Sequence, residues 1–251
     1  MSERKKVNSI IRAVDILKVI SKGNNKLSAI SEELQLGKGT VHRILNTLEH
    51  TDMVKQDPIN REYFLGPELL SLSASQSIAH SFLCACSRDE LIRLRDLSRE
   101  TVNLQIRLGL TRVCIMEYES LEEIKFISGA GVSLPIHLGS AGKMLMSEMN
   151  NLNLKILFEH ISFDKICSNT IIDKRMMLEE IAKIRKQGYA VSFSERLKGS
   201  ASISVPIKNY PTPVVLSVLG LENRFNKNSM KRCLKEMFKS ASRISKHLAK
   251  I

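Results

Sequence analysis

Tryptophan is absent from this sequence of 251 residues, and aromatic residues make up only 5% of it. Proteins that bind single-stranded nucleic acid stack its bases on aromatic side chains, so this composition argues against that class. No apolar run approaches the ~18 residues that a membrane span needs. The basic segment Met1–Lys6 leads into an amphipathic stretch rather than the apolar core of a secretion signal. We therefore expect a cytoplasmic protein that makes no membrane contact.

Motifs of the common enzyme and metal-binding classes are also missing. The sequence has no G-x-S-x-G, no H-E-x-x-H, no P-loop and no Rossmann fingerprint. Its six histidines show no metal-ligand spacing, and its five cysteines suit reduced thiols better than a disulfide framework. Cys84 and Cys86 stand too close together for a zinc knuckle or a thioredoxin pair, and we interpret them as structural. The sequence predicts a protein that is not an enzyme and needs no metal or cofactor.

The net charge of +12 is concentrated at one end of the chain. Residues 1–66 hold 11 Lys and Arg against 8 Asp and Glu, whereas residues 223–251 hold 9 against 1. We expect the last segment to be a docked helix with a solvated basic face, and a contact with DNA or an acidic partner is the alternative. The charge by itself supports solubility and weak steering rather than a function. The apolar stripe of this helix consists of Met230, Leu234, Met237, Ala241, Ile244, Leu248 and Ile251.

Residues 28–48 are the most informative stretch, because they have the pattern of two short helices joined by a tight turn. Ile30 and Leu34 lie one helical turn apart, and we expect Ser28 to cap this first helix. In the turn that follows, we expect Gly37 to take a left-handed backbone conformation. The second helix repeats the i, i+3, i+4, i+7 spacing at Val41, Ile44, Leu45 and Leu48.

This spacing turns the other face of the second helix outward. Gly39, His42, Arg43 and Asn46 share that face, which is small at its start and then basic and amide-bearing. A helix that enters the major groove of DNA needs such a face. The alternative is an ordinary helical hairpin with a solvated face.

The neighbouring segments favour DNA binding. Residues 7–21 carry Val7, Ile10, Val14 and Leu17 at helical spacing. After the helix pair, residues 53–56 and 62–65 have the pattern of two short strands around a turn. Three helices followed by a hairpin are the plan of a winged helix-turn-helix. Lys55 and Arg61 of the hairpin would lie near the phosphate backbone, where contacts fix position without reading sequence.

The rest of the chain alternates between strand and helix patterns. Pro67 begins a helix that we expect to run through Ile78 and to join two domains, and a second helix covers about 82–100. In residues 102–108 apolar residues alternate with Asn103, Gln105 and Arg107, which predicts a half-buried strand. Strand groups separated by helices indicate an antiparallel sheet with helices on its faces. We therefore expect an α+β fold, which belongs to the α/β class in its broad sense. The further expected strands are 112–119, 124–128, 189–194, 201–208 and 213–219, and the expected helices are 140–149, 152–160 and 175–187.

Several segments resemble the IclR-type family of bacterial transcriptional regulators, in matching order and spacing. The resemblance implies a winged helix-turn-helix domain at residues 1–66, a linker helix at 67–81 and a GAF-like effector-binding domain at 82–251. It also implies double-stranded operator DNA as a partner and a homodimer or dimer of dimers. The segments that carry it are Ser9–Ala13, Leu27–Leu34, Lys38–Leu48, Tyr63–Gly66, Gly131–His137, Ala141–Lys143, Gly188–Ala190 and Val205–Ile207.

On this plan, Arg43, His42 and Asn46 contact bases from the recognition helix. Arg12, Lys38, Lys55 and Arg61 hold phosphates. Gly39 and Thr40 lie at the start of the recognition helix, where the family usually has serine in place of Gly39. The substitution loses a hydroxyl that can bond phosphate and slightly weakens the helix.

A candidate effector site opens the helix after the Pro-containing loop at Pro135. Free backbone N–H groups and the dipole at a helix start favour an anion such as a carboxylate. The resemblance places Ser140, Ala141 and Gly142 there, although a plain helix start with close packing would use the same residues. His137 precedes this helix, as a structural residue or as part of the site. The resemblance adds the strand residues Ser192, Ser202, Ser217 and Leu219.

The strand positions depart from the family pattern. Acid-sensing relatives often have aspartate in place of Ser192, cysteine in place of Ser202 and serine in place of Leu219. We therefore expect the position of the site to carry over, but not the identity of the ligand. Each serine taken alone has the alternative of a solvated or locally bonded hydroxyl.

Together these observations predict a sequence-specific transcriptional regulator controlled by a small-molecule effector, an organic acid or another small metabolite. Repressor is the commoner role in the family, and activator stays open. The alternative is a ligand-binding or scaffolding module whose helix-turn-helix has become a protein interface.

Overall fold

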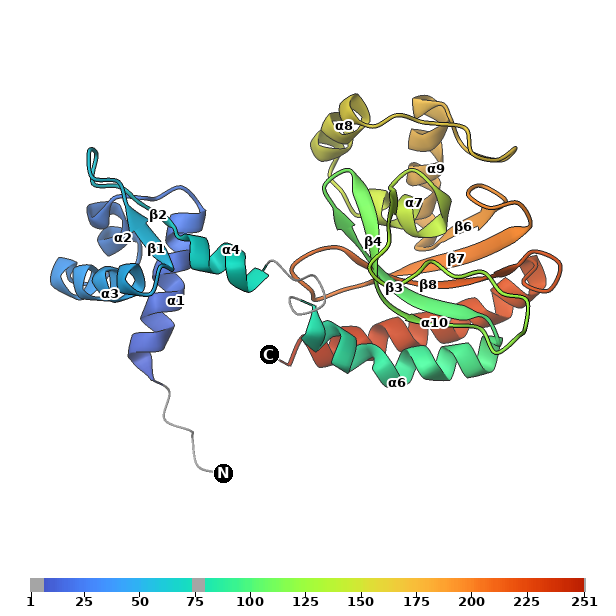
Figure 1. The fold of residues 1–251 in the computed structure, drawn as a ribbon, viewed down its shortest axis with the longest axis horizontal. Coiled ribbons are helices and arrows are strands. Elements are labelled where there is room, and N and C mark those ends of the chain that lie inside the picture. The colour runs from blue at the N-terminus through green and yellow to red at the C-terminus, as the bar shows by residue number, and fades with distance from the viewer. Residues whose placement is uncertain (1–6, 74–79, 251) are drawn as a thin grey trace. The chain divides into compact units, whose positions relative to one another are not determined.

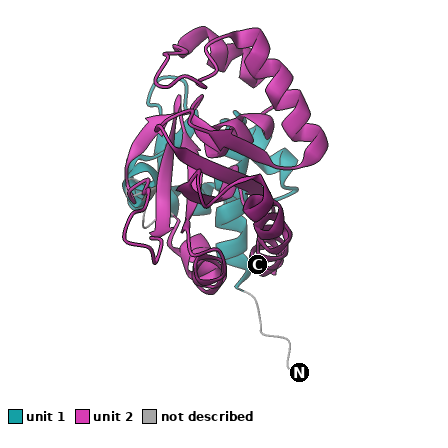
Figure 2. Cartoon of the chain, turned by 90° about the vertical axis from the view of Figure 1, so that its right-hand side faces the viewer, with its two compact units in different colours: residues 1–79 teal, residues 80–251 magenta. Residues whose placement is uncertain are grey.

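A computed structural model describes residues 7–73 and 80–250 of the chain. It divides into two compact units, residues 1–79 and 80–251, which are coloured separately in Figure 2. The helix expected after Pro67 does begin at that residue, and the part expected around Ile78 lies outside the described residues. No helix in the described ranges is long and apolar enough to cross a membrane.

The first unit is a winged helix-turn-helix, as the sequence predicts (Figure 1). Its two strands pair antiparallel, with Val54 opposite Leu65. The core between the helices and the hairpin contains the side chains of Ile16, Leu45 and Tyr63, each at most 2% exposed. The elements are α1 (Asn8–Ser21), α2 (Leu27–Glu33), α3 (Lys38–His50), β1 (Val54–Gln56), β2 (Tyr63–Leu65) and α4 (Pro67–Ser73).

Helix α1 buries a different stripe from the expected one. Ile16, Val19 and Ile20 in its second half are buried, because only this half packs on α2 and α3. The first half leaves its apolar side chains exposed, so it carries an uncovered apolar surface. This surface, the α1 apolar patch, consists of Val7, Ile10, Ile11 and Val14.

The turn between α2 and α3 differs from the prediction in two residues. Ser28 lies inside α2 and caps nothing, since the N-cap is Lys26. The left-handed residue is Gln35, with φ of 51°, whereas Gly37 has φ of −59°. The reason is a Schellman arrangement: Leu36 N–H donates to Ser31 O at 3.0 Å, and Gln35 N–H donates to Glu32 O at 3.2 Å. That pattern places the left-handed residue directly after the helix end.

The second unit is a six-stranded antiparallel sheet in the order β5-β4-β3-β8-β7-β6. Helices α6 and α10 cover one face, and α7 lies on the other (Figure 1). The expected antiparallel sheet with helices on its faces is therefore confirmed. The elements are α6 (Ser81–Ser98), β3 (Thr101–Leu108), β4 (Thr111–Tyr118), β5 (Ser133–Pro135), α7 (Gly139–Ser147), α8 (Asn151–His160), α9 (Lys174–Gln187), β6 (Ala190–Phe193), β7 (Ser200–Ile207), β8 (Val214–Leu221) and α10 (Lys227–Leu248).

The main core lies between the sheet and the helix pair α6 and α10. Leu91 and Leu94 of α6 are fully buried in it, whereas Leu97 near the end of this helix is 53% exposed. The apolar stripe of α10 packs against this layer, with Met237 and Ile244 fully buried, whereas the predicted stripe residue Ile251 lies outside the described residues. The closing helix is thus docked, and its basic residues occupy the outer face.

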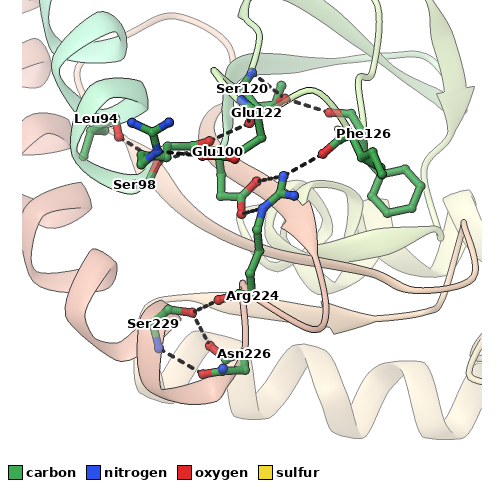
Figure 3. A network of polar contacts seen from close by, with 12 residues as sticks. Leu94, Ser98, Glu100, Ser120, Glu122, Phe126, Arg224, Asn226 and Ser229 are labelled. Atoms are coloured by element: carbon green, nitrogen blue, oxygen red, sulfur yellow. Dashed lines mark hydrogen bonds and ion pairs between the residues drawn. The ribbon is translucent and has the colours of Figure 1, made fainter.

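Residues 124–128 do not form the expected strand. Thr101 Oγ1 donates to Phe126 O at 2.7 Å, and Arg224 Nη2 donates to Ile124 O at 2.8 Å (Figure 3). Because side chains bond these carbonyls, the segment needs no neighbouring strand. On the side of β4 away from β3, the strand that pairs with it is β5.

The same network buries a carboxylate beneath the segment. Glu100 is 3% exposed and accepts two hydrogen bonds from Arg224, at 2.6 and 2.9 Å (Figure 3). Removing one partner of such a pair leaves an uncompensated buried charge.

We expect Arg224→Met to lower the free energy of unfolding by about 3 kcal/mol, because it leaves the buried Glu100 carboxylate without its positively charged partner. The measurement is urea unfolding of the full chain. Arg175→Met is the control, since Arg175 pairs with Glu179 on an open surface and is worth less than about 1 kcal/mol there. Equal effects of the two substitutions would contradict the assignment.

Candidate nucleic-acid interface and ligand pocket

The outward face of α3 is the one that the apolar spacing predicts. His42, Arg43 and Asn46 are exposed, and the opposite face is buried against the rest of the unit. Among the described residues, no hydrogen bond or ion pair occupies these three side chains. Their donors and acceptors are therefore available to a partner.

The start of α3 is open. Lys38 and Gly39 are exposed, and Thr40 is half-buried. A Cβ added at Gly39 would meet no atom within 4 Å. The N-cap residue of α3 is Gly37, which has no side chain that could accept a capping hydrogen bond. The first backbone N–H groups of α3 therefore lack a side-chain acceptor at the N-cap.

The hairpin forms an ordered wing. Asp57 Oδ1 accepts from Ile59 N–H at 2.8 Å, and Gln56 Nε2 donates to Arg61 O at 3.0 Å. Arg61 takes a left-handed conformation with φ of 61°, and Ile59 at the tip is 91% exposed. The sequence reasoning missed Ile59, although an apolar residue inside a polar turn is a visible signal.

Two other predicted phosphate contacts lie on the surface of the first unit. Arg12 on α1 is exposed. Lys55 is exposed but already paired with Asp52 at 2.5 Å, and this hydrogen bond raises the pKa of Lys55. A phosphate would have to replace Asp52 as its partner.

The second unit contains a small polar cavity of about 30 Å³ where α7 begins on the sheet. Six of the predicted effector residues line it: Ser140, Ala141, Ser192, Ser202, Ser217 and Leu219. Residues that the sequence reasoning did not assign to the site complete the lining. They are Asn103, Gln105, Arg112, Ser128, Gly139, Arg196 and Ser200.

Strand alternation brings these residues together. Ser217 of β8 stands opposite Asn103 of β3 on one side and Ser204 of β7 on the other, and Ser202 stands opposite Ser192 of β6. Side chains two apart on a strand share a face, so the polar residues of these strands meet beneath α7. The polar face of β3 was expected to be solvated, but Asn103 and Gln105 are 0% and 3% exposed.

A chain of hydroxyl groups crosses this face. Ser140 Oγ donates to Ser202 Oγ at 2.7 Å and lies 2.8 Å from Ser204 Oγ, which lies 2.7 Å from Ser217 Oγ. Of the predicted site serines, Ser140, Ser202 and Ser217 are thus locally bonded, the alternative that the sequence left open. Ser204 was missed, and its signal is the period of two that it shares with Ser200 and Ser202.

Two predicted site residues lie outside the cavity lining. A Cβ on Gly142 would stand 1.8 Å from Ile136 O, so this glycine allows α7 to pack closely on the preceding loop. The His137 ring packs on Phe163 at 5.4 Å and lines a separate hollow of about 200 Å³. Burial lowers the pKa of His137. Both residues therefore match the structural alternatives.

Arg112 is the residue that the sequence reasoning missed most clearly. It is 4% exposed, it donates to Gln105 Oε1, and its Nε has no hydrogen-bond partner among the described residues. Burial lowers the pKa of Arg112 to about 9, and repulsion from Arg196 adds to this effect. An arginine on a strand is usually solvated, so nothing in the sequence marked this one as buried.

A buried ion pair fixes the loop that carries Arg196. Lys143 of α7 is 2% exposed, and its Nζ lies 2.5 Å from Glu195 Oε1 and 3.3 Å from Glu180 Oε1. Burial raises the pKa of Glu195, and Lys143 opposes this shift. The β6–β7 loop is thereby tied to the helix whose first turn lines the cavity.

These features define a class. A winged helix with an exposed polar recognition face, followed by a sheet domain with a polar cavity, is the architecture of a ligand-responsive transcriptional regulator. The family model for the IclR helix-turn-helix domain matches residues 9–58, and the model for the bacterial transcriptional regulator IclR C-terminal region matches residues 76–246. The chain belongs to the IclR family.

Named relatives agree. The chain is 28% identical over 202 residues to the HTH-type transcriptional regulator BhcR of Paracoccus denitrificans, covering 80% of this chain and 72% of the relative. It is 27% identical over 229 residues to the HTH-type transcriptional repressor AllR of Escherichia coli, covering 90% and 84%. The crystal structure of an IclR-family regulator from Rhodococcus sp. superposes with a TM-score of 0.73 at 25% identity, covering 98% and 97%. These relatives are regulators, not enzymes.

We expect Gly142→Ala to lower the free energy of unfolding by about 1–3 kcal/mol, because the new Cβ overlaps the backbone of Ile136. Thermal unfolding of the full chain measures the effect. Gly39→Ala is the control in open space, where the better helix propensity of alanine raises stability by up to about 1 kcal/mol. A Gly142→Ala protein as stable as the wild type would rule out the close approach.

Proposed function

We propose that this protein is a sequence-specific repressor that binds double-stranded operator DNA through α3 and the wing. The observation that carries the proposal is the exposed face of α3, where the side chains of His42, Arg43 and Asn46 have no partner among the described residues. Arginine can donate two hydrogen bonds to the acceptors of guanine, and asparagine can donate one and accept one at the edge of adenine, both in the major groove. The relative AllR is named a repressor, which supports that sign of regulation.

Basic residues around α3 would hold the DNA backbone. Lys38 lies at the start of α3, where the dipole adds to its attraction for phosphate. Arg61 on the wing and Arg12 on α1 are exposed, and Lys55 exchanges Asp52 for a phosphate. Such contacts set the register on the duplex.

We further propose a homodimer, or a dimer of such dimers, joined in part through the α1 apolar patch. Val7 and Ile10 are 58% and 62% exposed, which is costly for apolar side chains in a free protein. A second copy of the same surface would cover them in a twofold contact. Two recognition helices would then read half-sites one or more turns of DNA apart, roughly 34 Å per turn.

The polar cavity of the second unit is the proposed effector site, and a small organic acid is the proposed effector. Two arginines and the first turn of α7 favour an anion there. The acid would regulate DNA binding by preferring one state of the protein, because only a difference in affinity shifts a population. The proposed place of action is the cytoplasm, where operator and metabolite meet.

We expect Arg43→Ala to weaken binding to the specific operator by ~1–3 kcal/mol, since it removes a base contact. A mobility-shift titration on the genomic fragments that the protein retains measures this loss. Arg175→Ala removes a positive charge that is also exposed, but lies in the second unit, and should change affinity little. If Arg43→Ala binds the operator as well as the wild type, the recognition face is wrongly assigned.

A second prediction separates DNA binding from the scaffolding alternative. Four phosphate-binding side chains in each of two copies give a slope of roughly −7 for log K against log salt concentration, because counterions are released. Fluorescence anisotropy on labelled duplex between low and physiological salt measures the slope. A shallow slope would indicate that the helix-turn-helix serves a protein interface.

A further inference from the structure

The cavity at the start of α7 is lined by two positive charges and by no carboxylate. Arg112 is 4% exposed, and its only hydrogen-bonded side-chain partner among the described residues is the neutral Gln105. Its Nε makes no hydrogen bond. A buried charge without a counter-charge is strongly unfavourable, and a guanidinium keeps its proton at neutral pH.

The carboxylates nearest to the cavity are committed elsewhere. Glu117 accepts from Asn103 Nδ2 at 3.0 Å and from the backbone N–H groups of Ser128 and Gly129 at 2.9 Å each. Glu195 holds Lys143 at 2.5 Å. Glu117 also attracts Arg196 electrostatically. No ion pair joins either cavity arginine to a carboxylate within the described ranges, so a ligand is the source of counter-charge that we consider for the buried Arg112.

The geometry places two anion-binding points in one cavity. Arg112 Nη2 lies 3.7 Å from where a Cβ of Gly139 would stand, so this guanidinium and the positive end of α7 act on the same spot. Arg196 approaches from the β6–β7 loop. A ligand with one negative charge would neutralise the first point and leave the second guanidinium without a counter-ion in the cavity.

The hydroxyl groups of the cavity, in contrast, need no ligand to satisfy their hydrogen bonds. Ser140, Ser202, Ser204 and Ser217 satisfy one another in a continuous chain. A neutral polar ligand would therefore leave the largest unsatisfied group of the cavity, the Arg112 guanidinium, without a charged partner. Charge, rather than hydroxyl recognition, dominates the specificity of this site.

We propose that the effector is a short dicarboxylate whose two carboxylates pair with Arg112 and Arg196. The proposal rests on the proposed function, in which this cavity holds the effector. The cavity measures about 30 Å³, the space of one or two water molecules, so the ligand has to be short. Admitting it requires the half-buried Arg196 side chain to swing outward and then to return to the second carboxylate, while Glu195 stays bound to Lys143.

The test compares acids of equal shape and different charge. Oxalate, malonate and succinate are each measured beside the monoamide and the diamide, by thermal shift and calorimetry on the full chain at neutral pH. At least one dicarboxylate should bind roughly thirtyfold more tightly than its own monoamide, because the amide leaves one guanidinium unpaired. The diamide should not bind, and sulfate as a compact dianion should bind more weakly because it does not span both arginines.

Variants assign the two carboxylates. Arg196→Gln should remove the preference for dicarboxylate over monoamide while the monoamide still binds. Arg112→Gln should abolish binding of both and should raise the melting temperature of the ligand-free protein, because it deletes an uncompensated buried charge. A purely structural Arg112 would give the opposite change in melting temperature. Lys198→Gln changes the same charge on an exposed residue of the same loop and should behave as wild type.

The outcomes separate this inference from the proposed function. If a monocarboxylate binds as tightly as any of the dicarboxylates, and binding is lost in Arg112→Gln but kept in Arg196→Gln, the effector site stands and the dicarboxylate is wrong. Sulfate binding as tightly as the best dicarboxylate would also overturn the two-point contact. If no acid of any charge changes either stability or DNA affinity, both the effector site and the dicarboxylate are wrong.

Discussion

The second unit depends on a sheet that is buried on both faces, one of them apolar throughout and the other mixed, with Val215 and Ala190 in an apolar cluster beside a group of polar side chains. The face toward α6 and α10 carries Val102, Ile203 and Leu216 and needs nothing but close packing. The face beneath α7 carries serine, asparagine and glutamine side chains at almost no exposure. Water cannot reach these groups freely, so each must find its partner inside the protein or on a ligand. Serine hydroxyl groups bond one another, and Asn103 Nδ2 donates to Glu117. Arg112 is the group for which the fold supplies no counter-charge.

Helix α7 closes this polar layer and is held from two sides. Gly142 lets the helix approach the loop at Ile136 more closely than any other residue would allow. Lys143, one residue later, binds Glu195 and Glu180 and so ties the helix to the β6–β7 loop and to α9. A buried charge pair gives little net stability, but breaking it is costly, and it fixes geometry. The loop that carries Arg196 is therefore anchored at the residue directly before this arginine.

The sequence predicted what periodicity controls and missed what depends on tertiary partners. The face of α3 followed from the spacing of Val41, Leu45 and Leu48, and the strand serines followed from the family resemblance. The left-handed Gln35 was missed because a Schellman bond, rather than the nearby glycine, chose the position. Residues 124–128 were taken for a strand because bonds from Thr101 and Arg224, distant in sequence, replaced the ladder. The buried polar face of β3 looked solvated, since alternation shows that a strand has two faces but not what covers each.

Affinity and stability are linked at Arg112. A ligand that binds only the folded protein stabilises it by an amount set by its concentration relative to its dissociation constant. The uncompensated guanidinium makes the ligand-free fold less stable than its packing would allow, and an anion that neutralises it recovers that difference. Under the proposed function, the same unsatisfied charge would weaken the empty protein and strengthen the complex, as expected for a residue kept for binding rather than for folding. The exposed face of α3 differs in this respect, because His42, Arg43 and Asn46 are hydrated and do not destabilise the free protein. The two sites thus differ in the solvation of their charged groups. Removing a charge should change the stability of the protein only at the buried site.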